Sequence, residues 1–318
     1  MQQKFTISLP PHVHGSSTTA GLMWRVVAAL LPALAVGVWV FGLGAIAVTA
    51  ISVAGCMFFE YAINRWMLRR ECTLMNGSAL LTGLLLAMNL PSNLPWWIVL
   101  IGALVAIGIG KMSFGGLGCN IFNPALVGRV FLLLSFPMQM TSWPLPTNSF
   151  GAYTDAVTGA TVLGAMKLGE MGASDVNMQD ALLGFGGGSL GEVGALALIV
   201  GGVYLIAARV ITWHIPVSIL ATVALFSLAV GAPVGVELLS GGLLLGAIFM
   251  ATDYVTSPMT RSGMIVYGIG IGVVTMVIRL WGAYPEGVSF AILLMNGATP
   301  LINRWFKPKR FGERSGAR

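Results

Sequence analysis

The sequence has very few charged residues. Only 9% of its 318 residues are Asp, Glu, Lys or Arg, and 56% are hydrophobic. A soluble domain has about 25% charged residues, so this chain has too little polar surface to cover a water-soluble globule. The composition therefore excludes a soluble protein and predicts a polytopic membrane protein.

Cysteine pairs and the common catalytic motifs are also absent. The three cysteines, Cys56, Cys72 and Cys119, form no CxxC pattern, and such spacing gives no support for a disulfide framework or a metal site. No GxGxxG motif opens a βαβ unit, and no GxxxxGK[ST] or HExxH motif is present. We therefore expect no catalytic residue, no metal and no nucleotide-binding domain.

Ten apolar runs follow one another along the chain. A helix that crosses a bilayer needs about 20 residues, and several runs are shorter, which is typical of broken or re-entrant segments enclosed by protein. The fold is predicted to be all-α, with about ten transmembrane helices. The runs cover residues 22–41, 43–63, 78–90, 96–110, 125–138, 193–208, 215–230, 236–251, 264–281 and 288–302.

The basic residues predict the orientation. If the N-terminus lies inside and every run crosses, 15 of the 17 Lys and Arg residues lie inside and only Lys167 and Arg279 lie outside. Cytoplasmic loops are enriched in Lys and Arg, so both termini are expected in the cytoplasm. The protein itself is expected in the inner (cytoplasmic) membrane. The net charge of +6 is explained in the same way, and no nucleic acid is expected as a partner.

This topology divides the chain into five parts. They are a cytoplasmic tail, a first membrane repeat, an extracytoplasmic loop, a second membrane repeat and a basic cytoplasmic tail, at residues 1–21, 22–138, 139–192, 193–303 and 304–318.

The two membrane parts contain similar sequences. NIFNPALVGRVF, residues 120–131, matches NGATPLINRWF, residues 296–306, when one residue is gapped. Because each part crosses five times, two such repeats must be inverted relative to each other. Inverted repeats place a binding site near the midplane, between the halves.

Amides at membrane depth form one candidate site. In FGGLGCNIFNPALVGR, residues 114–129, three glycines interrupt the helix before Asn120 and Asn123. An unpaired polar group in lipid costs several kcal/mol. These amides either satisfy the broken backbone or hydrogen-bond a flat polar ligand such as a flavin ring.

Two carboxylates near the membrane are candidates for an ion pathway. Glu60 lies near the end of the second run, and Asp253 follows the eighth. Ionisable groups inside a membrane are functional hypotheses by default. The alternative is that each is a paired or snorkelling charge.

A polar stretch in the long loop forms a third candidate site. DAVTGATVLG, residues 155–164, places small neighbours beside two threonines, Thr158 and Thr161. An exposed threonine of this kind is a good acceptor for modification by another enzyme. The alternative is an ordinary turn or helix cap.

These stretches resemble a known family. DAVTGAT is similar to the flavinylation motif D-x-x-[ST]-G-A-[ST] of the NqrB/RnfD family, membrane subunits of ion-translocating redox complexes. ISLPPHVHG, EYAINR, LLTGLLLAMNLP, GKMSFGGLGCNIFNPALVGR and ATDYVTSP extend the resemblance over nearly the whole chain. It implies two inverted five-helix repeats, similar to urea-transporter-like folds.

The resemblance also implies the cofactors. Thr161 would carry FMN through a phosphodiester bond, which a Mg-dependent flavin transferase forms outside the cytoplasm with FAD as donor. Asp155, Thr158, Gly159 and Ala160 would complete the attachment motif. A second, non-covalent flavin, riboflavin, is implied within the membrane, and by position Asn120 and Asn123 are the candidates to hold it.

The chain departs from the family pattern at two positions. Thr158 stands where Ser is common, which makes it a second attachment candidate, and Val162 stands where Pro often follows. Thr161 is favoured because the acceptor follows Gly-Ala.

The leader of about twenty residues favours the RnfD type over the NqrB type, which has a longer one. The resemblance then implies an electron-carrier subunit, not catalytic alone, in a Na⁺- or H⁺-translocating ferredoxin:NAD oxidoreductase complex with membrane, flavin-bearing and iron–sulfur subunits as partners. The alternatives are the B subunit of a Na⁺-translocating NADH:quinone reductase and a stand-alone channel or transporter for a small solute.

Overall fold

The computed structural model describes residues 18–70, 73–144, 158–159, 161–169, 182, 187–282, 284 and 286–307. In these ranges almost all regular structure is helical, and the strands are one two-residue pair. The prediction of a helical protein is confirmed.

The first half of the chain forms long helices that alternate with short ones. Gly42, at φ 63°, separates the first two helices, and Pro124 begins the fifth with Asn123 as its cap. Pro at the first helical position is favourable because its missing N–H would have no intrahelical partner. The helices are α1 (Thr19–Phe41), α2 (Leu43–Ala62), η1 (Ile63–Leu68), η2 (Leu74–Asn76), α3 (Ser78–Met88), α4 (Trp96–Leu104), η3 (Val105–Ile109), η4 (Met112–Phe114), α5 (Pro124–Ser135) and α6 (Pro137–Met140).

The second half contains one strongly broken segment. Gly241 and Gly242, at φ 72° and 65°, interrupt the eighth apolar run. The helices are α7 (Val162–Leu168), α9 (Ala195–Ala207), α10 (His214–Val230), α11 (Val234–Leu239), α12 (Leu243–Leu245), η6 (Gly246–Met250), α13 (Arg261–Trp281) and α14 (Val288–Trp305). The strands β1 (Trp143–Pro144) and β2 (Thr158–Gly159) pair antiparallel.

All ten predicted apolar runs fall on helices. Among the described residues, four helical stretches are long and apolar enough to cross a membrane, namely Thr19–Phe41, Leu43–Leu68, Trp96–Phe114 and Arg261–Trp281. Four more apolar helices are shorter, including the 11-residue α3. The chain is a membrane protein, and its short and interrupted segments agree with the prediction of broken helices.

The helices of the two halves pack in corresponding ways. α2 contacts α3 and α4, and α4 contacts α5; in the second half α10 contacts α11 and α13, and α13 contacts α14. The first helices of the two halves, α1 and α9, pack on each other.

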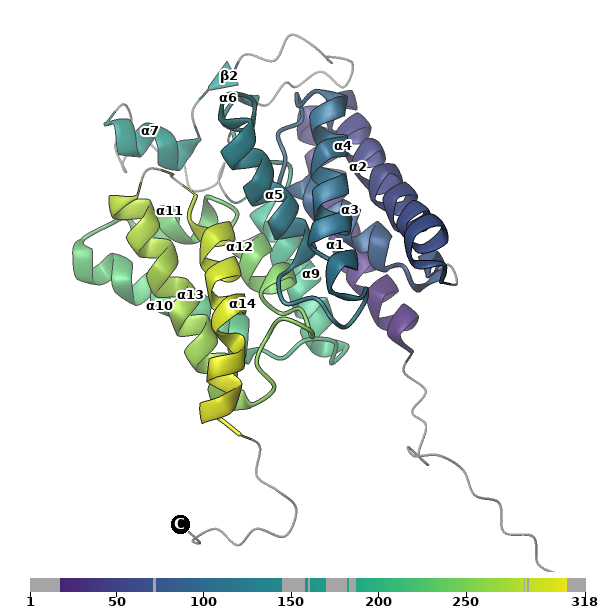
Figure 1. The fold of residues 1–318 in the computed structure, drawn as a ribbon. Coiled ribbons are helices and arrows are strands. Elements are labelled where there is room, and N and C mark those ends of the chain that lie inside the picture. The colour runs from purple at the N-terminus through teal and green to yellow at the C-terminus, as the bar shows by residue number, and fades with distance from the viewer. Residues whose placement is uncertain are drawn as a thin grey trace, which may run out of the picture.

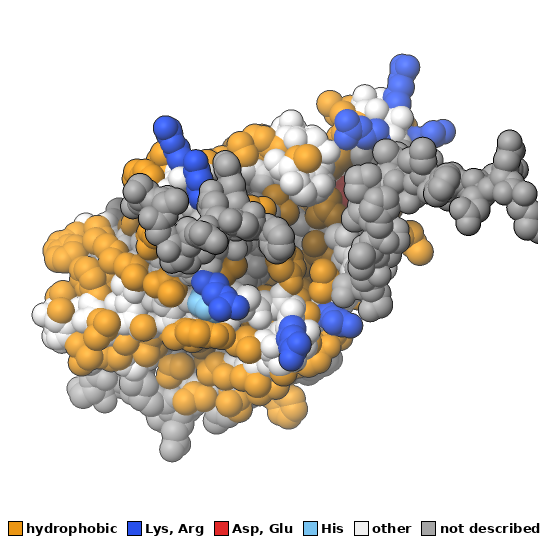
Figure 2. All heavy atoms as spheres, turned by 90° about the horizontal axis from the view of Figure 1, so that it is seen from below, with side chains coloured by type: hydrophobic (Ala, Val, Ile, Leu, Met, Phe, Trp, Pro, Cys, Tyr) orange, Lys and Arg blue, Asp and Glu red, His pale blue; other side chains and the backbone are white. Residues whose placement is uncertain are grey.

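The two ends of the bundle differ. We call the end where α1 begins and α14 ends the basal end, and the end where α6, β2 and α7 lie the apical end (Figure 1). Seen from the basal end, Lys and Arg side chains project from a largely hydrophobic surface (Figure 2). The exposed basic residues in the described ranges are Arg25, Arg65, Arg69, Arg70, Lys167, Arg209, Arg261, Arg304 and Lys307.

The charge count needs one correction. Lys111, Arg129 and Arg279 are buried in ion pairs, so they do not report which loop faces the cytoplasm. Arg129 in particular is not a cytoplasmic loop residue, because it lies inside α5. Of the exposed basic residues, Lys167 belongs to α7 at the apical end. The positive-inside rule therefore still favours a cytoplasmic basal end, and the side of the membrane stays a prediction.

Close contact between α1 and α9 gives a first testable expectation. A Cβ at Gly201 would overlap the carbonyl oxygen of Ala29 and lie 3.1 Å from the ring of Phe249. Backbone cannot move aside cheaply, so Gly201→Ala should lower the free energy of unfolding by about 1–3 kcal/mol. Thermal unfolding in detergent measures this. The matched control is Gly108→Ala, where the nearest atom is a flexible methyl 3.7 Å away; equal stability of the two variants would contradict the prediction.

Candidate functional site

A polar-rimmed cavity lies between the two halves of the chain. The space within it that the centres of water-sized spheres can reach is about 90 Å³. Its walls come from α1, α3 and residues 111–124 of the first half, and from the end of α9 and residues 248–255 of the second. Because the first turn of α1 contributes Leu22 and Met23, the cavity lies toward the basal end.

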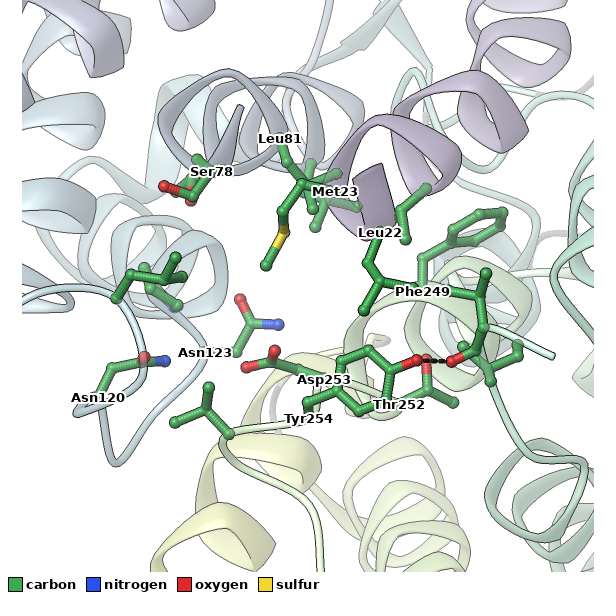
Figure 3. Close-up of a pocket in the computed structure, with 18 of the residues that line it drawn as sticks. Leu22, Met23, Ser78, Leu81, Asn120, Asn123, Phe249, Thr252, Asp253 and Tyr254 are labelled. Atoms are coloured by element: carbon green, nitrogen blue, oxygen red, sulfur yellow. Dashed lines mark hydrogen bonds between the residues drawn. The ribbon is translucent and has the colours of Figure 1, made fainter. Parts of the chain in front are cut away.

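Asn120, Asn123 and Asp253 all line this cavity. Figure 3 shows them on facing segments, with the Asn123 amide close to the Asp253 carboxylate. The sequence predicted each residue as a candidate separately, and the fold brings the three together. We call this space the polar cavity. Its remaining walls are mostly apolar, including Leu22, Leu81 and Phe249.

The two asparagines have different structural roles. Asn123 caps α5 by accepting a hydrogen bond from the backbone N–H of Ala125 at 3.1 Å, and it donates to the Met250 carbonyl at 3.2 Å. Asn120 donates to the Phe122 carbonyl at 3.1 Å, and its amide lowers the pKa of the nearby Asp253 carboxyl. Part of the alternative interpretation is therefore correct, because both amides satisfy backbone groups of the broken segment.

Asp253 lies in the turn between η6 and α13, outside the four long spans. The Thr256 hydroxyl donates to it at 3.3 Å. Burial raises the pKa of the Asp253 carboxyl above its ordinary value, although hydrogen bonds from Val255, Thr256 and Asn120 oppose the shift. Among the described residues, no Lys or Arg forms a salt bridge with Asp253. Its role as an ion-pathway residue stays a prediction.

Glu60 belongs to a hydrogen-bond network beside the cavity in which both of its carboxylate oxygens have a donor. One of its oxygens accepts from Lys111 Nζ at 2.5 Å, and the other accepts from the Thr73 hydroxyl at 2.8 Å. Lys111 also donates to the Ser78 hydroxyl at 2.7 Å, and both of these residues line the cavity. Glu60 thus has the contacts of a paired charge. A role in ion movement stays a prediction.

The described part of the DAVTGAT motif, Thr158, Gly159 and Thr161, lies at the apical end. Thr158 and Gly159 form β2, with Gly159 opposite Trp143 and Thr158 opposite Pro144. Asp155 and Ala160 lie outside the described residues, as does the side chain of Thr158. The segment therefore continues from a paired strand through Thr161 directly into α7.

Thr161 is not the exposed threonine that the sequence predicted. It is only 4% exposed, and its hydroxyl accepts a hydrogen bond from the Gly164 N–H at 3.1 Å. It is the N-cap of α7, as the helix-cap alternative expected. α7 is held on the bundle by Lys167, which donates to the carbonyls of Arg279 (3.0 Å) and Gly282.

Sequence reasoning missed a buried cluster of charged residues. Arg129 of α5 donates to Glu286, before α14, and to the side-chain oxygen of Asn89 at 2.5 Å. Glu192 lies close enough for the Glu286 carboxylate to raise its pKa. The sequence places Glu192 at the end of the long loop and Arg129 among the cytoplasmic residues. The only sequence feature that could have indicated their burial is that both lie next to Gly-rich, apolar stretches.

Comparison with known proteins agrees with the motifs. Residues 6–312 match the model of the NQR2, RnfD, RnfE family. The D subunit of the Na⁺-translocating ferredoxin:NAD⁺ oxidoreductase complex of Acetobacterium woodii is 49% identical over 309 residues, which is 96% of this chain and 95% of that protein.

Two other relatives are similar over equally long alignments. The D subunit of the proton-translocating ferredoxin:NAD⁺ oxidoreductase complex of Clostridium ljungdahlii is 42% identical and covers 98% of this chain and 97% of its own. The D subunit of the ion-translocating oxidoreductase complex of Stutzerimonas stutzeri is 43% identical, with 93% of each chain covered. The resemblance found in the motifs is confirmed: this chain belongs to the NQR2, RnfD and RnfE family.

Proposed function

We propose that this chain is the D subunit of an ion-translocating ferredoxin:NAD oxidoreductase complex, in which it carries electrons through the membrane. The observation that supports this most strongly is the 49% identity to such a subunit over 96% of the chain. The assignment makes the other subunits of the complex its partners. It is favoured over the B subunit of a Na⁺-translocating NADH:quinone reductase because all three of these relatives are named as D subunits.

The proposed carrier at the apical end is FMN attached to Thr161. The support is chemical, because the motif offers a hydroxyl two residues after Gly159, the glycine that ends the paired strand. The burial of Thr161 adds a condition: a transferase can reach the hydroxyl only if α7 leaves the bundle, or before it packs there. A bound flavin supplies one- and two-electron redox chemistry, and the protein supplies its position.

The proposed carrier in the polar cavity is riboflavin. The cavity has apolar walls for a flat ring and amide groups, Asn120 and Asn123, for a mixed donor and acceptor edge. It lies toward the basal end, whereas Thr161 lies at the apical end. With a flavin at each of these two places, electrons would cross the membrane in two shorter steps. A solute channel would need neither flavin.

The inverted-repeat architecture is part of the same proposal. Its support is the recurrence of contacts between corresponding helices and the pairing of α1 with α9. The two similar sequences also meet: α5 packs on α14, and Phe122 lies 3.6 Å from the position a Cβ would take at Gly297. A pseudo-twofold axis between α5 and α14 would place the polar cavity near the junction, as such folds do. We further propose a urea-transporter-like arrangement, with Thr161 extracytoplasmic.

The direct experiment is to purify the complex that contains this chain and identify every flavin by mass. We expect FMN on the peptide that includes Thr161, and riboflavin in the fraction released by denaturation. Protein from cells that lack the flavin transferase is the control and should retain riboflavin alone. A complex free of both flavins would overturn the proposal and favour the solute-transporter alternative.

Asn120 gives a test of the riboflavin site alone. Asn120→Ala removes an amide at the cavity wall and leaves the α5 cap at Asn123 intact. A hydrogen bond contributes about 1 kcal/mol, so we expect riboflavin to bind roughly 5- to 10-fold more weakly. The flavin retained after equilibrium dialysis measures this.

The matched control for Asn120→Ala is Asn93→Ala, because Asn93 is exposed and outside the cavity. Unchanged riboflavin retention in Asn120→Ala would show that this amide serves the backbone only.

A further inference from the structure

Glu192 and Glu286 form a pair of neighbouring carboxyl groups, which we call the carboxyl pair; Glu286 is buried and Glu192 is half-buried. Glu192 lies in the turn before α9, and Glu286 lies just before α14. A Cβ at Gly242 would lie 3.6 Å from a Glu192 oxygen and 3.9 Å from Arg129 Nη1, so Glu192 lies beside the guanidinium that holds Glu286. The Ser189 hydroxyl donates to Glu192 at 3.0 Å, and Arg129 donates to one oxygen of Glu286.

The second oxygen of Glu286 has no hydrogen-bond partner among the described residues, although it is fully enclosed. The residue as a whole is only 7% exposed. A buried carboxylate oxygen without a donor is costly, and two ionised carboxylates in contact repel strongly at low dielectric. Both problems disappear if one proton lies between the two groups, because a protonated carboxyl donates to its ionised neighbour.

The local charges lead to the same conclusion. Two carboxylates face a single guanidinium, that of Arg129, so the cluster lacks one positive charge if both acids are ionised. Another buried basic group, Arg279, is occupied by Glu237 at 2.7 Å and by the carbonyl of Ser240 at 2.9 Å. Burial first, and then the Glu286 carboxylate, raise the pKa of Glu192 well above its ordinary value.

From this geometry we propose that the carboxyl pair binds one exchangeable proton at neutral pH. The proton is held by Glu192 and donated to the free oxygen of Glu286. A proton fits better than a metal ion, because hard cations need about six surrounding oxygens. No group of three His, Cys, Asp or Glu suited to a metal occurs among the described residues. A Cβ at Gly188 would lie 2.5 Å from a Glu192 oxygen, so the space around the pair is already narrow.

The carboxyl pair is connected to the polar cavity by direct contacts. Arg129 bonds Asn89, and the Asn89 amide lies 3.6 Å from the sulfur of Met250. The Met250 carbonyl accepts from Asn123, which lines the cavity. A change of charge in the cavity would therefore affect the carboxyl pair through Met250, Asn89 and Arg129. This link, unlike the proton site itself, rests on the proposed riboflavin.

Infrared spectroscopy of the full chain in detergent tests the proton site. A protonated carboxyl gives a C=O stretch that is separate from carboxylate bands and shifts in D₂O. We expect this band in the wild-type protein at neutral pH and its loss in Glu192→Gln, while Glu237→Gln keeps it. Because the pKa of Asp253 is also raised, the comparison is repeated in an Asp253→Asn background.

Several results would overturn the proposal. The first is the absence of the band in the wild-type protein, and the second is a band that survives in both Glu192→Gln and Glu286→Gln. The third is its removal by Na⁺ at fixed pH, which would identify a sodium site. The first two measurements need no flavin, so they stand if the proposed function fails. A shift of the band when cavity-bound riboflavin is reduced would support the connection between the polar cavity and the carboxyl pair. An unchanged band would refute that connection and leave the proton site standing.

Discussion

Thr161→Ala is expected to remove all covalently bound flavin from this chain. The phosphodiester needs a hydroxyl oxygen, and alanine offers none. Protein produced together with the flavin transferase should give a fluorescent band on a denaturing gel for the wild type and no band for the variant. The loss should be complete rather than partial, because the second Gly-Ala-Thr sequence, residues 297–299, lacks the Asp and the first threonine of the DAVTGAT motif.

The variant also removes a helix cap, so its controls must separate chemistry from folding. The Thr161 hydroxyl accepts from the Gly164 N–H, and loss of such a cap costs about 0.5–2 kcal/mol. Thr161→Asn keeps a capping side chain without a hydroxyl and should be folded but unlabelled. Thr161→Ser keeps both the cap and the hydroxyl and should be labelled.

Thr158→Ala completes this series. It should retain the fluorescent band, since Thr158 lies in β2 and precedes the Gly-Ala pair. A band that persists in Thr161→Ala and disappears in Thr158→Ala would move the attachment to the other threonine. A band absent from every variant and from the wild type would refute covalent attachment.

Replacing Arg129 with Met should cause the largest loss of stability. Arg129 is 5% exposed, and its removal leaves Glu286 buried beside Glu192 without a counter-charge. Breaking a buried ion pair by removing one partner costs about 3–5 kcal/mol. Loss of the bond to Asn89 adds to this, because that side-chain oxygen is also buried. Thermal or denaturant unfolding in detergent measures the change.

The control for Arg129→Met comes from the similar sequence in the other half. Arg304 occupies the corresponding position near the end of α14, but it is exposed. Arg304→Met should change the free energy of unfolding by about 0.5 kcal/mol or less. The double variant Arg129→Met/Glu286→Gln should recover much of the lost stability, because it neutralises the orphaned acid. Equal losses in the single and double variants would show that the guanidinium acts by packing alone.

Hydropathy predicted the helices well because lipid imposes one constraint along the whole chain. Each of the ten apolar runs became helical, since backbone groups in a bilayer must be satisfied within their own segment. The glycines of the eighth run also marked a real break, at Gly241 and Gly242. Local sequence decides these features, so they could be read without knowledge of the fold.

The candidate site was less predictable because its contacts join distant parts of the chain. Arg129 and Glu286 are 157 residues apart, and no local pattern distinguishes a buried arginine from one at the membrane surface. Lys111 was likewise counted as an orientation signal, although it neutralises Glu60. The burial of Thr161 depends on how α7 packs at the apical end, and the DAVTGAT motif contains no information about that packing.

The pairing of β2 with β1 limits how far any group on Thr161 can travel. Gly159 is fixed opposite Trp143, and the two residues from there to Thr161 span at most about 7 Å when fully extended. Even if α7 were released, the attachment oxygen would stay on a short tether. A cofactor held in this way cannot shuttle like a swinging arm, so electron donors and acceptors would have to come to it.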